Sequence, residues 1–408
     1  MKLNDSNNAV AAIVSSRKKR LQLAVILGAI ATIGPLSIDM YLPALPALSS
    51  YFGTTAALVQ LSLTFFLLGL ALGQLVAGPL SDVYGRRLPL LIGMMIYAIS
   101  SLLCAFVPSI GLLIALRFIQ GLAGSVGVVI SRAAVRDLYT GSELTKFFSL
   151  LMIVNGLGPI VAPVLGGQLL RVTTWQGVFI VLSVAGLLFF VTILLRLPET
   201  LPKERRSRSG LKGTLRTFRS LLGNAKFMGY AISQGFVTAA MFAYISGSSF
   251  VLQNIFEVSP QMYSLIFAMN GLGIIISGQI AGRLSGKVGE RRLLFSGILL
   301  STLGGLLLLI TVLAGGGLVP ILICLFAVVS SVGMVAATTF SLAMQDQGET
   351  AGSASALLGL IPLLLGSGVA PLVGLGGGET AIPMAVVIAS ASSCAFITYI
   401  LLIRGGES

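Results

Sequence analysis

The sequence contains no histidine, and only 10% of its 408 residues are charged. Ordinary globular domains carry about 25% charged residues, so this composition excludes a water-soluble globular protein. The lack of histidine excludes metal sites with histidine ligands and catalysis that depends on an imidazole. What has to be explained instead is the apolar majority, which makes up 56% of the chain.

Cysteine is also scarce. Cys104, Cys324 and Cys394 each lie in an apolar run, without the paired spacing of a metal site or a disulfide framework. We interpret them as small buried hydrophobic residues. The sequence has no phosphate-binding loop of the form G-x-x-x-x-G-K-[ST], which argues against an ATP-driven pump. We therefore expect neither a metal nor a cofactor.

Apolar stretches of about 20 residues recur along the whole chain, and each is long enough to cross a hydrocarbon core as a helix. The sequence predicts an all-α membrane protein with twelve transmembrane helices. Their approximate ranges are 21–47, 56–79, 88–107, 110–135, 145–170, 175–196, 227–252, 260–283, 292–312, 317–343, 352–374 and 381–403.

The longest polar segment separates the sixth helix from the seventh. Residues 197–226 are strongly basic, which is typical of a cytoplasmic linker. We predict an N-terminal six-helix bundle at 21–196 and a C-terminal six-helix bundle at 227–403. Residues 1–20 lack the cleavage site of a signal peptide, and we expect them and residues 404–408 to form cytoplasmic tails.

The distribution of basic residues predicts the orientation. With the N-terminus in the cytoplasm, all of the 26 Lys and Arg residues except Arg117 and Arg171 fall in segments on the cytoplasmic side. Cytoplasmic loops of membrane proteins carry such an excess of positive charge. The net charge of +13 is therefore a topology signal and not evidence of nucleic-acid binding.

A short charged stretch occurs twice. GPLSDVYGRR begins at Gly78, and a degraded copy, GRLSGKVGERR, begins at Gly282, half a chain length later. The identical pairs are Gly78 and Gly282, Leu80 and Leu284, Ser81 and Ser285, Gly85 and Gly289, and Arg87 and Arg291. Both copies follow the second helix of their half, which favours two six-helix repeats of the same orientation.

The first copy resembles motif A of the major facilitator superfamily, broadly G-x-L-x-D-x-x-G-R-R/K. The matching residues are Gly78, Leu80, Asp82, Gly85, Arg86 and Arg87. The resemblance implies a conformational latch, in which Asp82 binds a helix N-terminus or a basic residue in one state only. The alternative is a polar turn that serves topology alone. The second copy has Gly286 in place of Asp82, which puts an acidic latch there in doubt.

Two further stretches extend the resemblance to this superfamily. Residues 116–137 are similar to motif B, with Arg117, Gln120 and Gly121 in matching places. GLGPIVAPVLGG, residues 156–167, is similar to motif C, which is associated with antiporters; it matches at Gly158, Pro159, Gly166 and Gly167.

SIDMYLPALP, residues 37–46, followed by SRAAVRDLY, residues 131–139, resembles the bicyclomycin-resistance (Bcr/CflA) branch of drug–proton antiporters. The resemblance implies the major facilitator fold and drug–proton antiport. It says almost nothing about the substrate.

Charged residues inside the membrane are expensive and are candidates for function. Of the thirteen acidic residues, Asp39 alone lies within a predicted span, and Arg117 is the one clearly interior base. We predict that Asp39 exchanges the proton, in a helix loosened by Pro43 and Pro46. The alternative is that Asp39 marks the outer end of a shorter helix. Arg117 either tunes Asp39, binds backbone carbonyls across helices, or has a purely structural role.

A second group of charges lies near the predicted cytoplasmic end of the fourth helix. Arg132 and Arg136 are four residues apart, and Asp137 follows directly. We predict an ion network among them at the membrane interface; contact with a substrate is the alternative.

The lining of a substrate cavity is the hardest feature to predict. Aromatic, methionine and amide side chains suit a large, mostly apolar ligand site, although each is also common in packing or at the lipid surface. The candidates are Tyr41, Phe65, Met152, Gln234, Phe236, Tyr244 and Asn270.

These patterns favour a proton-coupled efflux antiporter for small amphipathic compounds, working as a monomer in the inner (plasma) membrane. The alternative is a symporter or facilitator of the same fold that imports a nutrient. A membrane enzyme would need clustered catalytic groups, which one intramembrane acid without histidine does not provide. Composition does not exclude a channel, but the repeat favours alternating access.

Overall fold

The structure is a computed structural model that describes residues 17–138, 156–202, 206, 218–345, 347, 351–376 and 378–404. Every regular element in these ranges is a helix, as the all-α prediction requires. Eleven helices among the described residues are long and apolar enough to cross a membrane, and a shorter apolar helix covers Gly156–Leu169. That shorter helix is the described part of the predicted span at 145–170.

The helices follow one another with short connections. Before the linker they are α2 (Arg17–Ala31), α3 (Ile33–Asp39), η1 (Leu42–Ala44), α4 (Leu45–Phe52), α5 (Ala56–Tyr84), α6 (Arg87–Cys104), α7 (Ile110–Leu138) and α9 (Trp175–Arg196). After it they are α11 (Ala225–Phe250), η3 (Val251–Ile255), α12 (Pro260–Val288), α13 (Glu290–Leu313), α14 (Leu318–Met344), α15 (Ala351–Val373), η4 (Gly374–Gly376), α16 (Ile382–Thr398) and η5 (Tyr399–Arg404).

Three predicted boundaries were wrong, and one of them is the end of the span predicted at 260–283, which continues as α12 to Val288. The first span is not one helix over 21–47 but four pieces, α2, α3, η1 and α4, which reach Phe52; we call them together helix 1. The second span does not end at 79, because α5 continues through Pro79 to Tyr84. Most of the predicted turn from residue 80 is therefore helical, and the chain reverses over Gly85 and Arg86.

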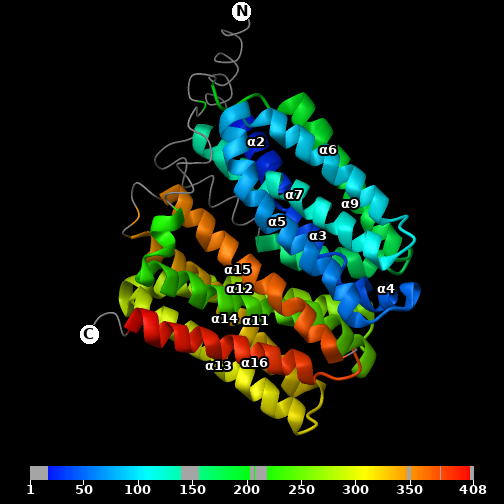
Figure 1. Cartoon of the computed structure of the whole chain (residues 1–408), viewed down its shortest axis with the longest axis vertical. Coiled ribbons are helices and arrows are strands. Elements are labelled where there is room, and N and C mark those ends of the chain that lie inside the picture. Colours follow the sequence, from blue (N-terminus) through cyan, green and yellow to red (C-terminus); the bar gives the residue numbers. More distant parts are fainter. Residues whose placement is uncertain are drawn as a thin grey trace, which may run out of the picture.

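The helices before and after the linker form two groups that lie side by side (Figure 1). In the first group α5 packs on α7 and α6 on α9, and in the second α12 packs on α14 and α11 on α16. Helix α15 lies against α5 and joins the groups. The linker boundaries themselves remain predictions, because most of residues 203–217 lie outside the described part of the chain.

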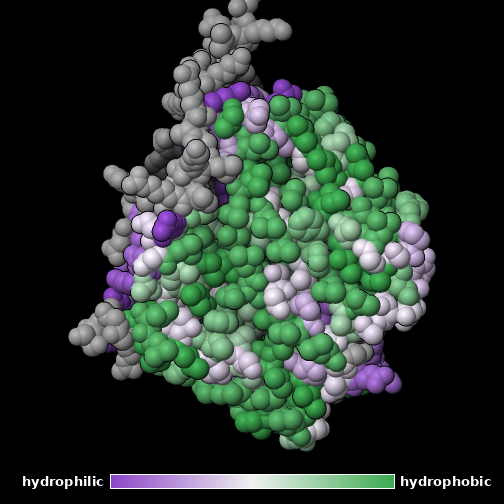
Figure 2. All heavy atoms as spheres, in the orientation of Figure 1, coloured by the Kyte–Doolittle hydropathy of each residue, from purple (hydrophilic) through white to green (hydrophobic). Residues whose placement is uncertain are grey.

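Hydrophobic residues cover most of the molecular face in Figure 2, and strongly hydrophilic residues lie mainly along its edges. Many large apolar side chains are exposed, among them Leu188, Leu195, Ile310 and Ile323. Soluble monomers rarely expose contiguous apolar patches of such extent, whereas a lipid bilayer covers them without cost.

The repeat seen in the sequence is also present in the backbone. Helices α5 and α12 are both 29 residues long. Each ends at a glycine with nearly the same positive φ, +89° at Gly85 and +90° at Gly289. Residues with a Cβ rarely adopt this conformation, so the glycines of the two copies serve the same chain reversal.

Candidate functional site

Asp39 is the last residue of α3, where helix 1 breaks. It is only 4% exposed, and the described residues offer its carboxylate neither a hydrogen bond nor an ion pair. The η1 segment that follows Asp39 packs against α11 and α12 of the other half. Asp39 therefore lies close to the boundary between the two halves.

The side chains near Asp39 form an aromatic and polar cluster. Asn270 Nδ2 donates to Tyr244 Oη at 2.8 Å, and the Tyr244 ring stacks on Phe267 with centroids 5.5 Å apart. Two predicted cavity residues, Tyr244 and Asn270, are thus brought together. Tyr263 and Phe267 were missed, although their spacing of four residues on one helix face was a signal.

The described residues contain no group of three or more Cys, Asp or Glu side chains that could hold a metal ion. An isolated buried carboxylate can bind a proton or an organic cation.

Arg117 is fully buried within the first half and does not contact Asp39. Its Nη2 donates to the Ser37 carbonyl at 3.0 Å, and its Nη1 donates to Gln120 Oε1 at 2.6 Å. The guanidinium carbon lies 4.6 Å from the Tyr41 ring centroid and 4.2 Å from that of Phe66. Such cation–π contacts stabilise a desolvated arginine by about 0.5–2 kcal/mol each. Of the predicted roles, the contact with a backbone carbonyl is the one observed.

The other predicted cavity residues do not gather around Asp39. Tyr41 shares a hydrogen bond of 2.5 Å with Ser62 on the Arg117 side of helix 1. Phe65 is 37% exposed and packs edge-on against a phenylalanine of α7. Gln234 has a buried Oε1 without a partner in the described ranges, and Phe236 packs in a separate hydrophobic cluster. Met152 lies outside the described residues.

The motif C residues press their helix against helix 1 and α12. A Cβ at Gly158 would lie 3.0 Å from Pro35, and one at Gly166 would collide with the carbonyl of Met40, next to Asp39. A Cβ at Gly167 would collide with Ser264 of α12. Pro159 lies against the backbone of Gly271, which belongs to α12 like Ser264. A Cβ at Gly271 would be 3.6 Å from the Pro159 carbonyl oxygen. These residues thus allow the backbone of the Gly156–Leu169 helix to lie close to helix 1 at its break and to α12.

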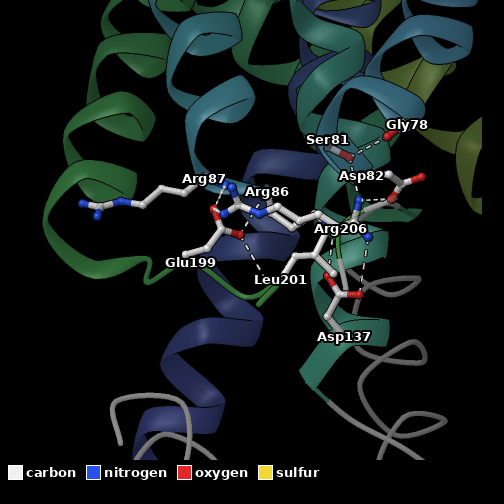
Figure 3. Close-up of polar contacts among 9 residues, drawn as sticks. All are labelled: Gly78, Ser81, Asp82, Arg86, Arg87, Asp137, Glu199, Leu201 and Arg206. Carbon is white, nitrogen blue, oxygen red and sulfur yellow. Dashed lines mark hydrogen bonds and ion pairs between the residues drawn. The ribbon is translucent and has the colours of Figure 1, made fainter. Parts of the chain in front are cut away.

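Motif A forms a charged cluster at the predicted cytoplasmic end (Figure 3). Arg86 lies 2.5 Å from Asp82 and 2.8 Å from Asp137 at the end of α7, and it also donates to Ser81 Oγ at 2.7 Å. Burial by itself lowers the pKa of Arg86, but the hydrogen bonds and charges of Asp137 and Asp82 outweigh it and raise that pKa. On the alkaline side, the stability from these two ion pairs is retained until the pH rises through this raised pKa.

Glu199, just after α9, and Arg206, which lies 3.6 Å from it, belong to this cluster and were not predicted from the sequence. Glu199 holds the turn. It accepts hydrogen bonds from the backbone N–H groups of Arg86 at 2.8 Å and Arg87 at 3.3 Å. A carboxylate at a helix N-terminus is favourable, so Glu199 and not Asp82 caps α6. Arg87 points away and donates to the Leu194 carbonyl at 2.7 Å (Figure 3). A Cβ at Gly85 would collide with Glu199.

Motif A residue Gly78 is also part of the local structure, because its carbonyl accepts a hydrogen bond from Ser81 at 2.8 Å. The turn is therefore held by contacts within the first half and by Glu199 directly after it. The ion network predicted for Asp137 with Arg132 and Arg136 was wrong in its partner, because among the described residues Asp137 pairs with Arg86.

The predicted outer ends of the two halves are joined by side chains that donate to carbonyls of the opposite half. The donors and acceptors are Gln60 to Ser246 at 2.9 Å, Ser249 to Leu42 at 2.7 Å, Gln253 to Pro43 at 3.2 Å, and Gln261 to Gly167 at 2.9 Å. All four bonds are uncharged and lie at the end opposite Gly85 and Gly289. The structure is thus closed at this end.

Comparison with known sequences agrees with the motifs. The sequence profile of the Major Facilitator Superfamily matches residues 27–371. An uncharacterized MFS-type transporter, YdgK, from Bacillus subtilis (strain 168) is 48% identical over 91% of this chain and 92% of its own. A bicyclomycin resistance protein homolog from Haemophilus influenzae is 29% identical, covering 95% and 98%. Multidrug resistance protein D from Escherichia coli (strain K12) is 28% identical, covering 86% and 88%.

Comparison with solved structures supports the fold. A mutant of the nucleoside transporter NupG superposes with a TM-score of 0.74 at 13% identity, covering 94% of this chain and 99% of that one. An inward-facing, unoccupied bacterial homolog of the human lysosomal transporter Spinster gives a TM-score of 0.69 at 15% identity, covering 96% of each chain.

Proposed function

This chain belongs to the Major Facilitator Superfamily, and we propose that it exports small amphipathic compounds in exchange for protons by alternating access. Relatives named for bicyclomycin and multidrug resistance that align with most of its length support the drug-efflux class. The observation that carries the proton coupling is Asp39, a buried carboxylate at the boundary of the halves without a partner among the described residues.

Asp39 binds either a proton or the positive group of a substrate in this proposal. A buried carboxylate is costly when it is ionised and unpaired, so it exchanges one positive partner for the other. Tyr244, Phe267 and Asn270 would hold the apolar and polar parts of the compound, since pockets for such ligands combine aromatic walls with a few polar groups. Competition for Asp39 then links export to proton entry.

The closed end and the charged cluster support the alternating-access cycle. The bonds from Gln60, Ser249, Gln253 and Gln261 close the predicted outer end. At the other end Asp82 is paired, among the described residues, within its own half, with Arg86. We infer that Asp82 engages the second half when the cytoplasmic end closes, as its latch role requires.

The orientation, the inner membrane and the monomeric state are parts of the same proposal. The basic residues of the linker support a cytoplasmic location of both termini. Protease added to inside-out vesicles should cut within residues 197–226, and cleavage in right-side-out vesicles alone would reverse the orientation.

The central test uses purified protein in detergent and measures proton release when a lipophilic cation, tetraphenylphosphonium, is added. The wild type should release protons, Asp39→Asn should not, and Asp39→Glu should retain part of the release because a carboxylate remains. Asp82→Asn serves as the control variant, since it removes an acid outside the site. Undiminished release and efflux in Asp39→Asn would refute the assignment.

Transport direction separates export from the nutrient-import alternative. In proteoliposomes with an imposed pH gradient, an antiporter moves the compound against the proton flow. A symporter would move both in the same direction, and this outcome would replace the proposed function.

A further inference from the structure

The break in helix 1 removes hydrogen bonds from its own backbone. Pro43 and Pro46 have no N–H group, so the carbonyls four residues before them, of Asp39 and Leu42, receive no α-helical hydrogen bond. Buried carbonyls need other donors. At this break the Leu42 carbonyl accepts the Leu45 N–H in a 3₁₀ turn, and side chains of other helices supply further donors.

Two of these donors come from the end of α11 and the π-helical turn η3 that follows it. Ser249 Oγ donates to the Leu42 carbonyl at 2.7 Å, and Gln253 Nε2 donates to the Pro43 carbonyl at 3.2 Å. Gln253 Nε2 also lies 2.8 Å from Ser249 Oγ and donates to it. Ser249 and Gln253 therefore act as one polar unit on the segment directly after Asp39.

A third donor, Arg117, binds the Ser37 carbonyl on the other side of Asp39. Arg117 belongs to the same half as helix 1, so this bond is retained when the halves separate. The bonds from Ser249 and Gln253 cross between the halves and have to break when the outer end opens. Asp39 thus lies between a contact within its own half and contacts that cross between the halves.

We propose that Ser249 and Gln253 are positioning residues for Asp39, which make its protonation depend on closure of the outer end. This inference rests on the proposed role of Asp39 in proton coupling. In the closed state the two side chains hold the η1 segment against α11, and the carboxylate stays buried beside Tyr244 and Tyr263. Opening releases the carbonyls of Leu42 and Pro43 to water and changes the polarity around the carboxylate.

Other titratable groups near Asp39 do not replace this link. Tyr244 and Tyr263 belong to α11 and α12, the helices that pack on the η1 segment after Asp39, and Arg117 from α7 is bound two residues away at Ser37. The Gly156–Leu169 helix, which presses on Met40, contains no ionisable residue. Tyrosine and arginine keep their protonation near neutral pH, so changes in this range report Asp39.

The test measures the protonation of Asp39 directly and without substrate. Dicyclohexylcarbodiimide reacts with a protonated carboxyl group, and mass spectrometry of the peptide containing Asp39 gives the labelled fraction at each pH. The variants are Ser249→Ala, Gln253→Ala and a matched control, Gln261→Ala. Gln261 also donates across the halves to a carbonyl, at 2.9 Å, but it binds Gly167 and not helix 1.

We expect the midpoint pH of labelling to move by about half a unit or more in Ser249→Ala and Gln253→Ala, because the surroundings of a buried carboxyl set its titration. Gln261→Ala should keep the wild-type midpoint, because the bond that it removes does not hold helix 1 and the three other bonds across the halves keep the outer end closed. Equal midpoints in all four proteins, or an equal shift in the control, would overturn the inference. Failure of substrate-induced proton release would reject the proposed function and leave this labelling comparison intact.

Discussion

Glu290 holds in the second half the position that Arg86 holds in the first, and it carries the opposite charge. Arg86 donates to Asp137 near the end of α7 at 2.8 Å. Glu290 accepts from Ser341 at 2.7 Å and from Gln345 at 3.2 Å, near the end of α14. Each turn is thus bound to the fourth helix of its half, but the first bond is ionic and the second is not.

This difference predicts unequal costs for removing the charges. Arg86→Leu leaves Asp137, whose side chain is 16% exposed, without its ionic partner, and an uncompensated buried charge is strongly destabilising. Glu290→Gln keeps an oxygen that accepts from Ser341. Thermal unfolding in detergent should show a Tm lowered by several degrees for Arg86→Leu and nearly unchanged for Glu290→Gln. A comparable decrease of the Tm in both variants would show that the opposite charges of Arg86 and Glu290 do not make the two turns differ in stability.

Asp82→Asn tests the latch. The Asp82 side chain is 47% exposed, and an exposed ion pair of this spacing contributes at most about 1 kcal/mol, so the fold should persist with Arg86 still bound to Asp137. We expect slower turnover and a dissociation constant for tetraphenylphosphonium within about twofold of the wild type. Weaker binding at unchanged turnover would place Asp82 in the substrate site instead.

Arg117→Lys tests the buried guanidinium. A lysine keeps the charge but cannot donate at once to the Ser37 carbonyl and to Gln120 in the planar geometry of arginine. Loss of these bonds should cost about 1–3 kcal/mol and lower the Tm. Arg171→Lys, at an exposed arginine, is the matched control. A shift in the pH profile of transport without loss of stability would instead favour direct tuning of Asp39.

Gly166→Ala tests the backbone approach beside Asp39. The added methyl group would collide with the Met40 carbonyl, and overpacking of this kind costs about 1–3 kcal/mol. Transport should fall by about tenfold or more, since the helix must move away from the break. Gly156→Ala, where the methyl group would meet Ile275 at 3.5 Å, should retain transport. If both variants transport equally, close approach at Gly166 is dispensable.

Composition and repetition in the sequence were sufficient for the fold class. Apolar runs of membrane-spanning length identify the helices without tertiary information, because in a bilayer every backbone polar group has to be satisfied within its own segment. Gly85 and Gly289 were also predictable as equivalent residues, since the copies align around them. Asp39 and Arg117 emerged by elimination, because few charged residues lie inside the apolar runs.

Only the tertiary structure decided which of these residues act together. Asp39 and Arg117 are both charged residues within predicted spans, yet Asp39 lies next to the segment that packs on α11 and α12, whereas Arg117 binds Ser37 within its own half. Glu199 caps α6 from the far end of α9, and Ser249 and Gln253 bind carbonyls more than 200 residues away in the chain. Periodicity reports the face of a helix that is apolar, but the partner of a polar side chain depends on how separate helices pack, and one sequence does not contain that information in its local pattern.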